Sequence, residues 1–473
     1  MKRLLLICCL VLLEAAIAHA ADNKRPNVLF IAIDDLRDWV HYLGVNQQVK
    51  TPNIDRLAAR GLAFTRAYCA APLCNPSRAA LLSGLRPSVT GIYNNNVDWR
   101  KVIPADATTL PLHFKDQGYY VAGAGKIYHG SFPRPSDWHD YFSGDSSEED
   151  DRRGRQRGQF THVAPDASNI IIGPIAGDDN TMPDYHFVSY IIRKLNEQRD
   201  QPFFLACGLK KPHLPWTVPK KYYELYPLDS IILPKILETD LDDVPPIGQR
   251  FAKRKEHDAI VRDGQWKACV QAYLATISFC DAMVGRLLDA LDKTTHANNT
   301  IICLWSDHGW HLGEKLHWHK STLWEEATRA PHIWVVPGLT KPGTRCDRPV
   351  DYMNIYPTLT DLCGLPTPKH VQGVSLRALL ANPSAPWDRP AITTHGQNNH
   401  TARSERWRYI RYADGGEELY DHQTDPLEWH NLANDPRFAS VKTELAKWLP
   451  KENAPIGPQV PNRKKTKRQR QPQ

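Results

Sequence analysis

Four short apolar runs along the chain predict buried strands. Each run is continuous and does not alternate with polar residues, which is expected where both faces of a parallel sheet are covered. Together they indicate a sheet at the centre of a large domain. The runs lie at residues 27–33, 202–207, 301–305 and 332–336.

A long helix is predicted between the second and third of these runs, over residues 271–293. Strands that alternate with helices indicate an α/β domain with a doubly wound, mostly parallel sheet flanked by helices. In such a domain the functional site lies beyond the carboxyl ends of the strands. The apolar positions at helical spacing are Tyr273, Ile277, Cys280, Val284, Leu287 and Leu291.

A smaller unit is expected after the Pro-rich stretch at residues 382–386. Residues 407–412 and 418–421 resemble antiparallel strands, and residues 438–449 a helix. We therefore predict a main domain at residues 21–382 and a C-terminal α+β subdomain with an antiparallel sheet at residues 383–455. The polar residues 143–158 are interpreted as a surface loop.

The two ends of the chain differ from its body. Residues 1–20 have the basic start, the apolar run and the small-residue cleavage site of a secretory signal. We expect export to the periplasm or the medium after cleavage near Ala20, with no stable membrane insertion; an uncleaved anchor is the alternative. Residues 456–473 carry a basic run that is interpreted as a disordered, solvated tail, the alternative being a contact with nucleic acid or a heparin-like polymer.

The net charge of +7 comes from the two ends, because the tail contributes +6 and the signal +1. The body is therefore close to neutral, and no nucleic-acid partner is expected. Two of the 10 cysteines lie in the signal. The other eight show no metal-binding spacing, and their pairing is not readable from the sequence.

The stretch Cys74-Asn-Pro-Ser-Arg78 places a thiol at a predicted helix start. Asn75 is interpreted as the N-cap, and Gly84 as the C-terminal stop. Cys74 is then expected just before the helix, where free N–H groups and the helix dipole favour a tetrahedral oxyanion. Arg78 adds a planar cation in the first turn. The alternative is a buried cysteine beside an ordinary capped helix.

Carboxylates follow two of the predicted strands. Asp34 and Asp35 can converge on one site only if the first strand ends there, because adjacent side chains of a strand point to opposite faces. Asp307, after the third run, adds another oxygen ligand. Unpaired carboxylates are costly unless a cation neutralises them. The group therefore favours a hard divalent ion, although each Asp alone is typical of a loop or cap.

These residues resemble the ordered motifs of the sulfatases of the alkaline-phosphatase-like superfamily. The resemblance covers nearly all of the mature chain. Within the family, the pairs Lys126/His129 and Asp307-His308 are most similar to iduronate-2-sulfatase and its bacterial relatives. The matching blocks are Asp34-Asp35, Cys74 to Arg78, residues 82–87, 125–129, 211–215 and 307–320, and, in the C-terminal subdomain, residues 419–421, 425–426 and 431–432.

The resemblance implies an alkaline-phosphatase-like fold and a formylglycine-dependent nucleophile. A formylglycine-generating or anaerobic maturation enzyme would oxidise Cys74 during export, and the hydrated aldehyde would attack sulfur. One metal ion per chain, by family analogy calcium, would polarise the nucleophile and the sulfate. Its implied ligands are Asp34, Asp35, the Cys74-derived oxygen, Asp307 and His308.

The resemblance also implies roles for basic residues. Arg78 and Lys126 would hold the diol and its charge, and His129 would take the proton of the second hydroxyl. His213 and Lys320 would contact sulfate or protonate the leaving alcohol. As single residues, the Lys and His would be ordinary loop residues.

Three histidines stand out in this comparison. His308 stands where many sulfatases carry Asn, and imidazole is an unusual calcium ligand. The resemblance therefore implies a metal more firmly than it implies calcium. His317 and His319 beside Lys320 are interpreted either as part of the pocket or as surface residues.

The function implied is that of an exported sulfatase. It would hydrolyse a sulfate ester of a sulfated sugar, such as iduronate 2-sulfate or another sulfated polysaccharide fragment. One alternative is a phosphate or phosphonate ester hydrolase that uses the same cysteine. Another is a non-catalytic carbohydrate-binding relative whose Cys74 stays a thiol; the complete set of metal, acid and base residues argues against it.

Overall fold

The structure is a computed structural model that describes residues 25–130, 134–144 and 160–460. The predicted signal at residues 1–20, most of the polar segment at residues 143–158 and the basic run of the tail lie outside the described residues.

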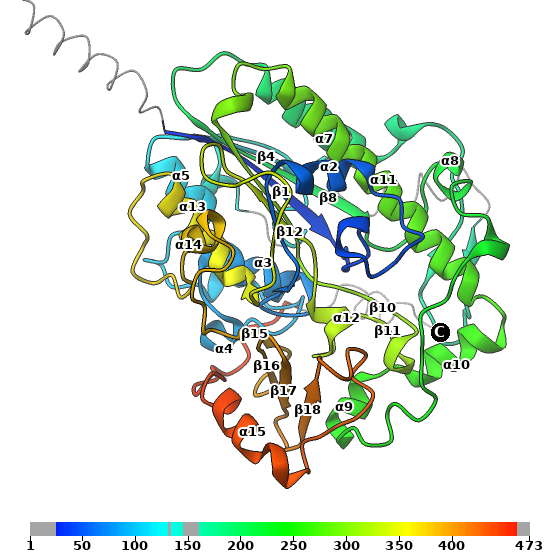
Figure 1. Ribbon diagram of the computed structural model, residues 1–473. Helices are drawn as coiled ribbons and strands as arrows, with labels where there is room; N and C mark the ends of the chain where they lie inside the picture. The colour runs from blue at the N-terminus through cyan, green and yellow to red at the C-terminus, as the bar shows by residue number, and fades with distance from the viewer. Residues whose placement is uncertain (1–24, 131–133, 145–159, 461–473) are drawn as a thin grey trace, which may run out of the picture.

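An eight-stranded sheet forms the centre of the larger part of the molecule (Figure 1). Neighbouring strands are parallel, except that β12 is antiparallel to both β9 and β2. The predicted mostly parallel sheet is therefore confirmed. In order across the sheet, the strands are β13 (Thr344–Cys346), β2 (Leu62–Phe64), β12 (His332–Val335), β9 (Thr300–Ser306), β1 (Asn27–Asp34), β8 (Phe203–Pro212), β4 (Tyr120–Gly125) and β5 (Asp140–Phe142).

Helices cover both faces of this sheet (Figure 1). Alternate residues of β1 face opposite sides, so Leu29 packs in one core cluster and Phe30 in the other. One face is covered by α2 (Pro52–Arg60), α7 (Pro183–Leu195) and α11 (Trp266–Asp292). The other is covered by α3 (Cys74–Ser83), α5 (Leu110–Asp116), α13 (Ile355–Leu362) and α14 (Arg377–Ala381).

The predicted helix at residues 271–293 is confirmed as most of α11. Among the described residues, α11 is the one helix long and apolar enough to cross a membrane. Its most apolar window is 83% buried inside the protein, where it packs on β8, α7 and α2. The eight cysteines of the described residues are all buried free thiols.

A second sheet of four antiparallel strands lies below the first in Figure 1 and confirms the predicted C-terminal strands. Helix α15 packs against its third strand. The elements are β15 (Ala391–Thr394), β16 (His400–Arg403), β17 (Trp407–Arg411), β18 (Glu417–Asp421) and α15 (Ala439–Ala446). Other short elements are α4 (Pro87–Thr90), α8 (Lys220–Tyr223), α9 (Pro246–Phe251), α10 (Arg254–Arg262), α12 (Glu325–Thr328), and the strand pairs β3 (Ala67–Tyr68) with β14 (Val350–Asp351), β6 (Thr161–His162) with β7 (Ile171–Ile172), and β10 (His311–Leu312) with β11 (Trp318–His319).

A buried ion-pair network joins the two parts. Arg408 of β17 is fully buried and pairs with both Glu325 of α12 and Glu428. Its guanidinium also donates to the carbonyl oxygen of Leu323 at 2.9 Å. Burial works to raise the pKa of Glu428, but Arg408 and His422 outweigh it and hold the pKa at about 2. The network fixes the C-terminal sheet against α12.

We expect Arg408→Met to lower the free energy of unfolding by about 3 kcal/mol, because Glu325 and Glu428 lose the buried cation that they share, although Arg403 and His422 still pair with them. Denaturant titration followed by tryptophan fluorescence measures this change. The matched control is Arg437→Met, whose ion pair with Asp435 lies at the surface and contributes little. Equal stability of the two variants would show that the buried network does not hold the sheets together.

Candidate active site

The carboxyl end of β1 places two carboxylates at one point. The strand ends at Asp34, and the pairing register shifts between Ile33 and Asp34. Asp35 follows in a left-handed conformation with φ 62°, which turns the chain out of the sheet. Its backbone N–H donates to Asp307 Oδ1 at 3.0 Å, beyond the end of β9. The two strand ends are therefore joined at the site, as the sequence predicts.

Cys74 is the first residue of α3, and this corrects the predicted helix start. The N-cap position is Leu73, and Asn75 lies inside the helix. The Asn75 side chain instead donates to the carbonyl oxygen of Val97 at 2.9 Å, which ties the neighbouring loop to the helix. Because α3 begins one residue before its predicted cap, the thiol lies within its first turn. Gly84 is confirmed as the C-terminal stop, with φ 72°.

Four buried ligand groups surround one point. One atom each from Asp35, Cys74, Asp307 and His308 lies within 4.8 Å of the others. His308 Nε2 is 3.3 Å from Asp35 Oδ1 and 3.4 Å from Cys74 Sγ. Asp35 Oδ2 is buried and has no hydrogen-bond partner in the part of the chain that the structure describes. Such an oxygen is costly unless a cation binds it, so the group fits a hard divalent ion.

The electrostatics of the same group agree with a cation site. Burial works to lower the pKa of His308, but Asp307, Cys74 and Asp35 together outweigh it and raise the pKa to about 9. Burial raises the pKa of Asp35, against the effect of Lys320. The His308 pKa shift reports neighbouring negative charge, and the Asp35 pKa shift reports a carboxylate buried away from water; a bound cation would stabilise the charged carboxylates in both cases.

Asp34 connects the acidic group to the basic side of the site. Its Oδ1 accepts from Arg78 Nη2 at 3.2 Å, and its Oδ2 pairs with Lys126 Nζ. Burial works to raise the pKa of Asp34, but Lys126, His213 and Arg78 hold it well below its usual range. One of its oxygens also falls within reach of Asp35, Cys74 and His213 ligand atoms.

Three cations surround Cys74. Lys320 Nζ lies 3.2 Å from Cys74 Sγ and 2.6 Å from Asp35 Oδ1. Arg78 is buried, and its Nε donates to Asp307 Oδ2 at 2.9 Å. Burial raises the pKa of Cys74, but Lys126 and Lys320 outweigh it and lower the pKa. The surroundings of this residue therefore stabilise negative charge.

The two predicted acid–base histidines lie at the edge of this charge cluster. Burial and the charge of Lys126 lower the pKa of His129 to about 3. His213 Nε2 is 3.8 Å from Asp35 Oδ2, and its side chain is 38% exposed. Burial lowers the pKa of His213 as well, against the effect of Asp35. Both imidazoles are therefore neutral near pH 7 and able to accept a proton.

All the residues that the sequence singles out for this site converge in the structure. They come from the ends of β1, β4, β8 and β9, from α3, and from the loop after β11. They are Asp34, Asp35, Cys74, Arg78, Lys126, His129, His213, Asp307, His308 and Lys320.

His317 and His319 are buried, so their interpretation as surface residues is wrong. His317 accepts from the Lys253 N–H at 2.9 Å and contacts the Lys320 carbonyl oxygen at 3.0 Å. His319 Nε2 lies 2.7 Å from a Glu256 oxygen. The residues on either side of Lys320 have left-handed backbone conformations: His319 has φ 76° and Ser321 has φ 77°. These contacts hold the loop that presents Lys320.

Two supporting hydroxyls were not predicted. Tyr273 of α11 donates to the Asp35 carbonyl oxygen at 2.7 Å and accepts from the Arg37 N–H at 3.1 Å. Ser77 donates to the Asp307 carbonyl oxygen at 2.6 Å. Ser77 lies within the motif from Cys74 to Arg78, so the sequence contained a signal that could have identified it. Tyr273 appears in the sequence only as a core position of a helix, and no local pattern marks it.

Comparison with known proteins gives matches over nearly the whole chain. The family model described as Sulfatase matches residues 26–365, and the one described as N-sulphoglucosamine sulphohydrolase, C-terminal, matches residues 313–454. A protein named Sulfatase from Formosa agariphila is 41% identical, covering 91% of this chain and 87% of the relative. The Iduronate 2-sulfatase of Mus musculus is 30% identical, covering 92% and 96%. A solved phosphonate monoester hydrolase from Silicibacter pomeroyi has the same fold, with a TM-score of 0.75, 21% identity and coverage of 89% and 94%.

The fold and the buried site thus define an ester hydrolase of the alkaline-phosphatase-like architecture. The chain belongs to the sulfatase family, and it is a sulfuric ester hydrolase. The predicted family is confirmed. The family implies a metal site and a formylglycine, and the group of Asp34, Asp35, Asp307 and His308 is the candidate for the metal.

Proposed function

We propose that the protein hydrolyses a sulfate ester of an anionic sugar, with iduronate 2-sulfate or a similar unit of a sulfated polysaccharide as substrate. The observation that carries this proposal is the position of Cys74, between a buried acidic group and three cations. The sulfate group of such an ester is a tetrahedral anion, and cations placed around it stabilise the negative charge that develops as the ester bond breaks. The similarity to a named iduronate 2-sulfatase supports the choice of substrate.

In this proposal Cys74 is converted to formylglycine by a formylglycine-generating or anaerobic maturation enzyme. A thiolate that accepted the sulfuryl group would have no simple way to expel it. The hydrated aldehyde would supply two hydroxyls: one would bond to sulfur as the bond from sulfur to the sugar oxygen breaks and the alcohol leaves, and the other would lose a proton so that the carbonyl re-forms as sulfate leaves. The raised pKa of Lys320 keeps it charged, so it would hold the sulfate and not give up a proton.

The other residues bind charge or move protons. Asp34, Asp35, Asp307 and His308 would hold one divalent cation, by family analogy calcium, which supplies charge stabilisation at the sulfate. Arg78 and Lys126 would hold the diol and its developing charge.

The histidines are the proposed proton-transfer groups. The low pKa of His129 leaves it neutral, so it would accept the proton of the second hydroxyl. His213, half-exposed beside Asp35, would contact the leaving alcohol.

The test compares kcat/KM for nitrophenyl sulfate, nitrophenyl phosphate and a phosphonate monoester, and then for a disaccharide with iduronate 2-sulfate. We expect a clear preference for the sulfate esters. A strong preference for phosphate or phosphonate would select the second candidate function, which the same fold supports in the Silicibacter pomeroyi enzyme. Absence of turnover in protein purified from its native export route, with Cys74 still a thiol, would select the non-catalytic alternative.

We also propose that the protein is exported. Residues 1–20 carry the sequence of a secretory signal, and maturation of Cys74 would take place along that route. Amino-terminal sequencing of the protein from its native cell should find a mature end next to Ala20. A chain that keeps Met1 would contradict this proposal.

A further inference from the structure

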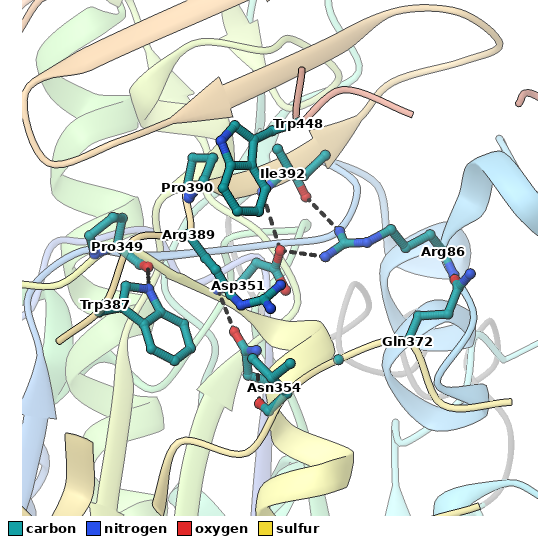
Figure 2. A pocket seen from close by; sticks show the side chains of 12 residues that line it. Arg86, Pro349, Asp351, Asn354, Gln372, Trp387, Arg389, Pro390, Ile392 and Trp448 are labelled. Carbon is teal, nitrogen blue, oxygen red and sulfur yellow. Dashed lines mark hydrogen bonds and ion pairs between the residues drawn. The ribbon is translucent and has the colours of Figure 1, made fainter. Parts of the chain in front are cut away.

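A polar recess lies between the main domain and the C-terminal sheet, away from the site at Cys74 (Figure 2). Arg86, three residues beyond the end of α3, lines it, whereas Cys74 begins the same helix. A helix of this length spans about 15 Å. The segment before β15 contributes Trp387 and Arg389, and the chain after α15 contributes Trp448. The recess is therefore separate from the sulfate-cleaving site.

The charge of the recess is positive. Asp351 is neutralised, because its Oδ2 accepts from Arg86 Nη2 at 2.8 Å and from the Ile392 N–H at 3.2 Å. Arg389, by contrast, has no carboxylate partner among the described residues, and its guanidinium lies 5.8 Å from the centre of the Trp448 ring. One exposed guanidinium is thus left without a counter-charge. Such a group binds sulfate or carboxylate through paired hydrogen bonds.

Two indole rings stand beside this cation. The Trp387 N–H donates to the Pro349 carbonyl oxygen at 2.8 Å, which fixes its ring. Trp448 is 39% exposed, although tryptophan is costly to leave in water. Figure 2 shows the Arg389 side chain between the two indoles, with Arg86 on the opposite side. A flat apolar face next to an unpaired cation suits a ring that carries an anionic group.

We propose that this recess binds one anionic sugar unit, with its sulfate or carboxylate group on Arg389 and its ring against the Trp387 and Trp448 indoles. The cavity volume of about 190 Å³ is smaller than the roughly 300–1,000 Å³ of pockets that enclose larger ligands, so it accepts a single unit. The choice of a sugar as ligand rests on the proposed function. A polysaccharide substrate carries several anionic units, and this recess binds a unit other than the one whose sulfate ester is hydrolysed at Cys74.

Fluorine NMR of the full-length protein labelled with fluorotryptophan tests the proposal, with the Trp448 resonance assigned from its loss in Trp448→Phe. Titration with glucosamine 6-sulfate and with glucuronate should shift this resonance to saturation with at least one of them, and the two arms tell sulfate from carboxylate. Glucose should leave it unchanged. In Arg389→Ala we expect the midpoint to rise about tenfold, because a charged hydrogen bond is lost.

The matched control is Arg193→Ala in α7. Arg193 is also exposed and lies over a tyrosine ring, 5.2 Å from its centre, but it is outside the recess. It should leave the midpoint unchanged. A Trp448 resonance that neither acid shifts, an equal response to glucose, or an unchanged midpoint in Arg389→Ala would overturn the proposal. Hydrolysis of nitrophenyl sulfate should be the same in Arg389→Ala and wild type, so failure of this site and failure of the proposed function are distinguishable.

Discussion

Cys74→Ala is expected to abolish sulfate ester hydrolysis, with a fall in kcat on the order of 10⁴-fold or more. The residue lies in the first turn of α3, with Lys320 Nζ 3.2 Å from its sulfur, and the carboxylates and imidazole around it form the candidate metal group. Alanine removes the group that bonds to sulfur and leaves the surrounding charges in place. The fold should persist, because alanine is well accepted in a helix. Steady-state kinetics with nitrophenyl sulfate measure the loss.

Two comparisons make this prediction specific. Cys363→Ala, which changes another buried cysteine at the carboxyl end of α13, should keep its activity. Cys74→Ser should be inactive wherever the maturation enzyme accepts only cysteine. Mass spectrometry of the peptide that contains Cys74 reports directly whether the sulfur has been lost. Substantial activity in the alanine variant would exclude this residue as the nucleophile.

Asp35→Asn is expected to remove the metal and to lower kcat by about 10³-fold, since loss of a metal's charge stabilisation costs several kcal/mol. Asp35 Oδ2 is a buried carboxylate oxygen with no hydrogen-bond partner among the described residues, and Asp35 belongs to the group with Cys74, Asp307 and His308. Asparagine tolerates the left-handed conformation of this position, so the backbone should keep its course. Elemental analysis of the purified protein gives the metal content independently of activity.

Asp38→Asn is the matched control for this change. Asp38 is also a buried carboxylate just after β1, but it pairs with Arg37 at 3.1 Å and lies outside the metal group. We expect it to keep one metal ion per chain. The same analysis identifies the metal, which the imidazole of His308 leaves open between calcium and other divalent ions. A full metal content in Asp35→Asn would show that Asp35 is not a ligand.

Much of this site follows from local sequence. The apolar run before Asp34 has the length of one buried strand. The carboxylates that follow it therefore lie at the end of that strand. The cysteine motif and Gly84 predict the two ends of α3. The predicted end at Gly84 is correct, and the helix starts one residue before the predicted N-cap. The error at Asn75 has a clear cause: an N-cap preference is local, but its side chain makes a better-satisfied contact with Val97 of the neighbouring loop.

Other features depend on contacts between distant segments. Tyr273 supports Asp35 across 238 residues of sequence, and nothing in the spacing of α11 distinguishes it from a core tyrosine. His317 and His319 have polar side chains, yet both are buried. Their hydrogen-bond partners, Lys253 and Glu256, lie at the start of α10, far away in the sequence. The burial of a polar residue is decided by where its hydrogen-bond partners lie, and those are brought together only by folding.

The sequence by itself determined the kind of sheet, the helix that carries Cys74 and a set of candidate site residues that lie together in the structure, because strand length, helix signals and family motifs are all local patterns. The tertiary structure alone decided that one oxygen of Asp35 has no hydrogen-bond partner among the described residues, which histidines are buried, and that Arg389 and Trp448 share a recess. The charge around a side chain and its exposure to water depend on the residues that surround it in space, and many of these residues are far away in the sequence.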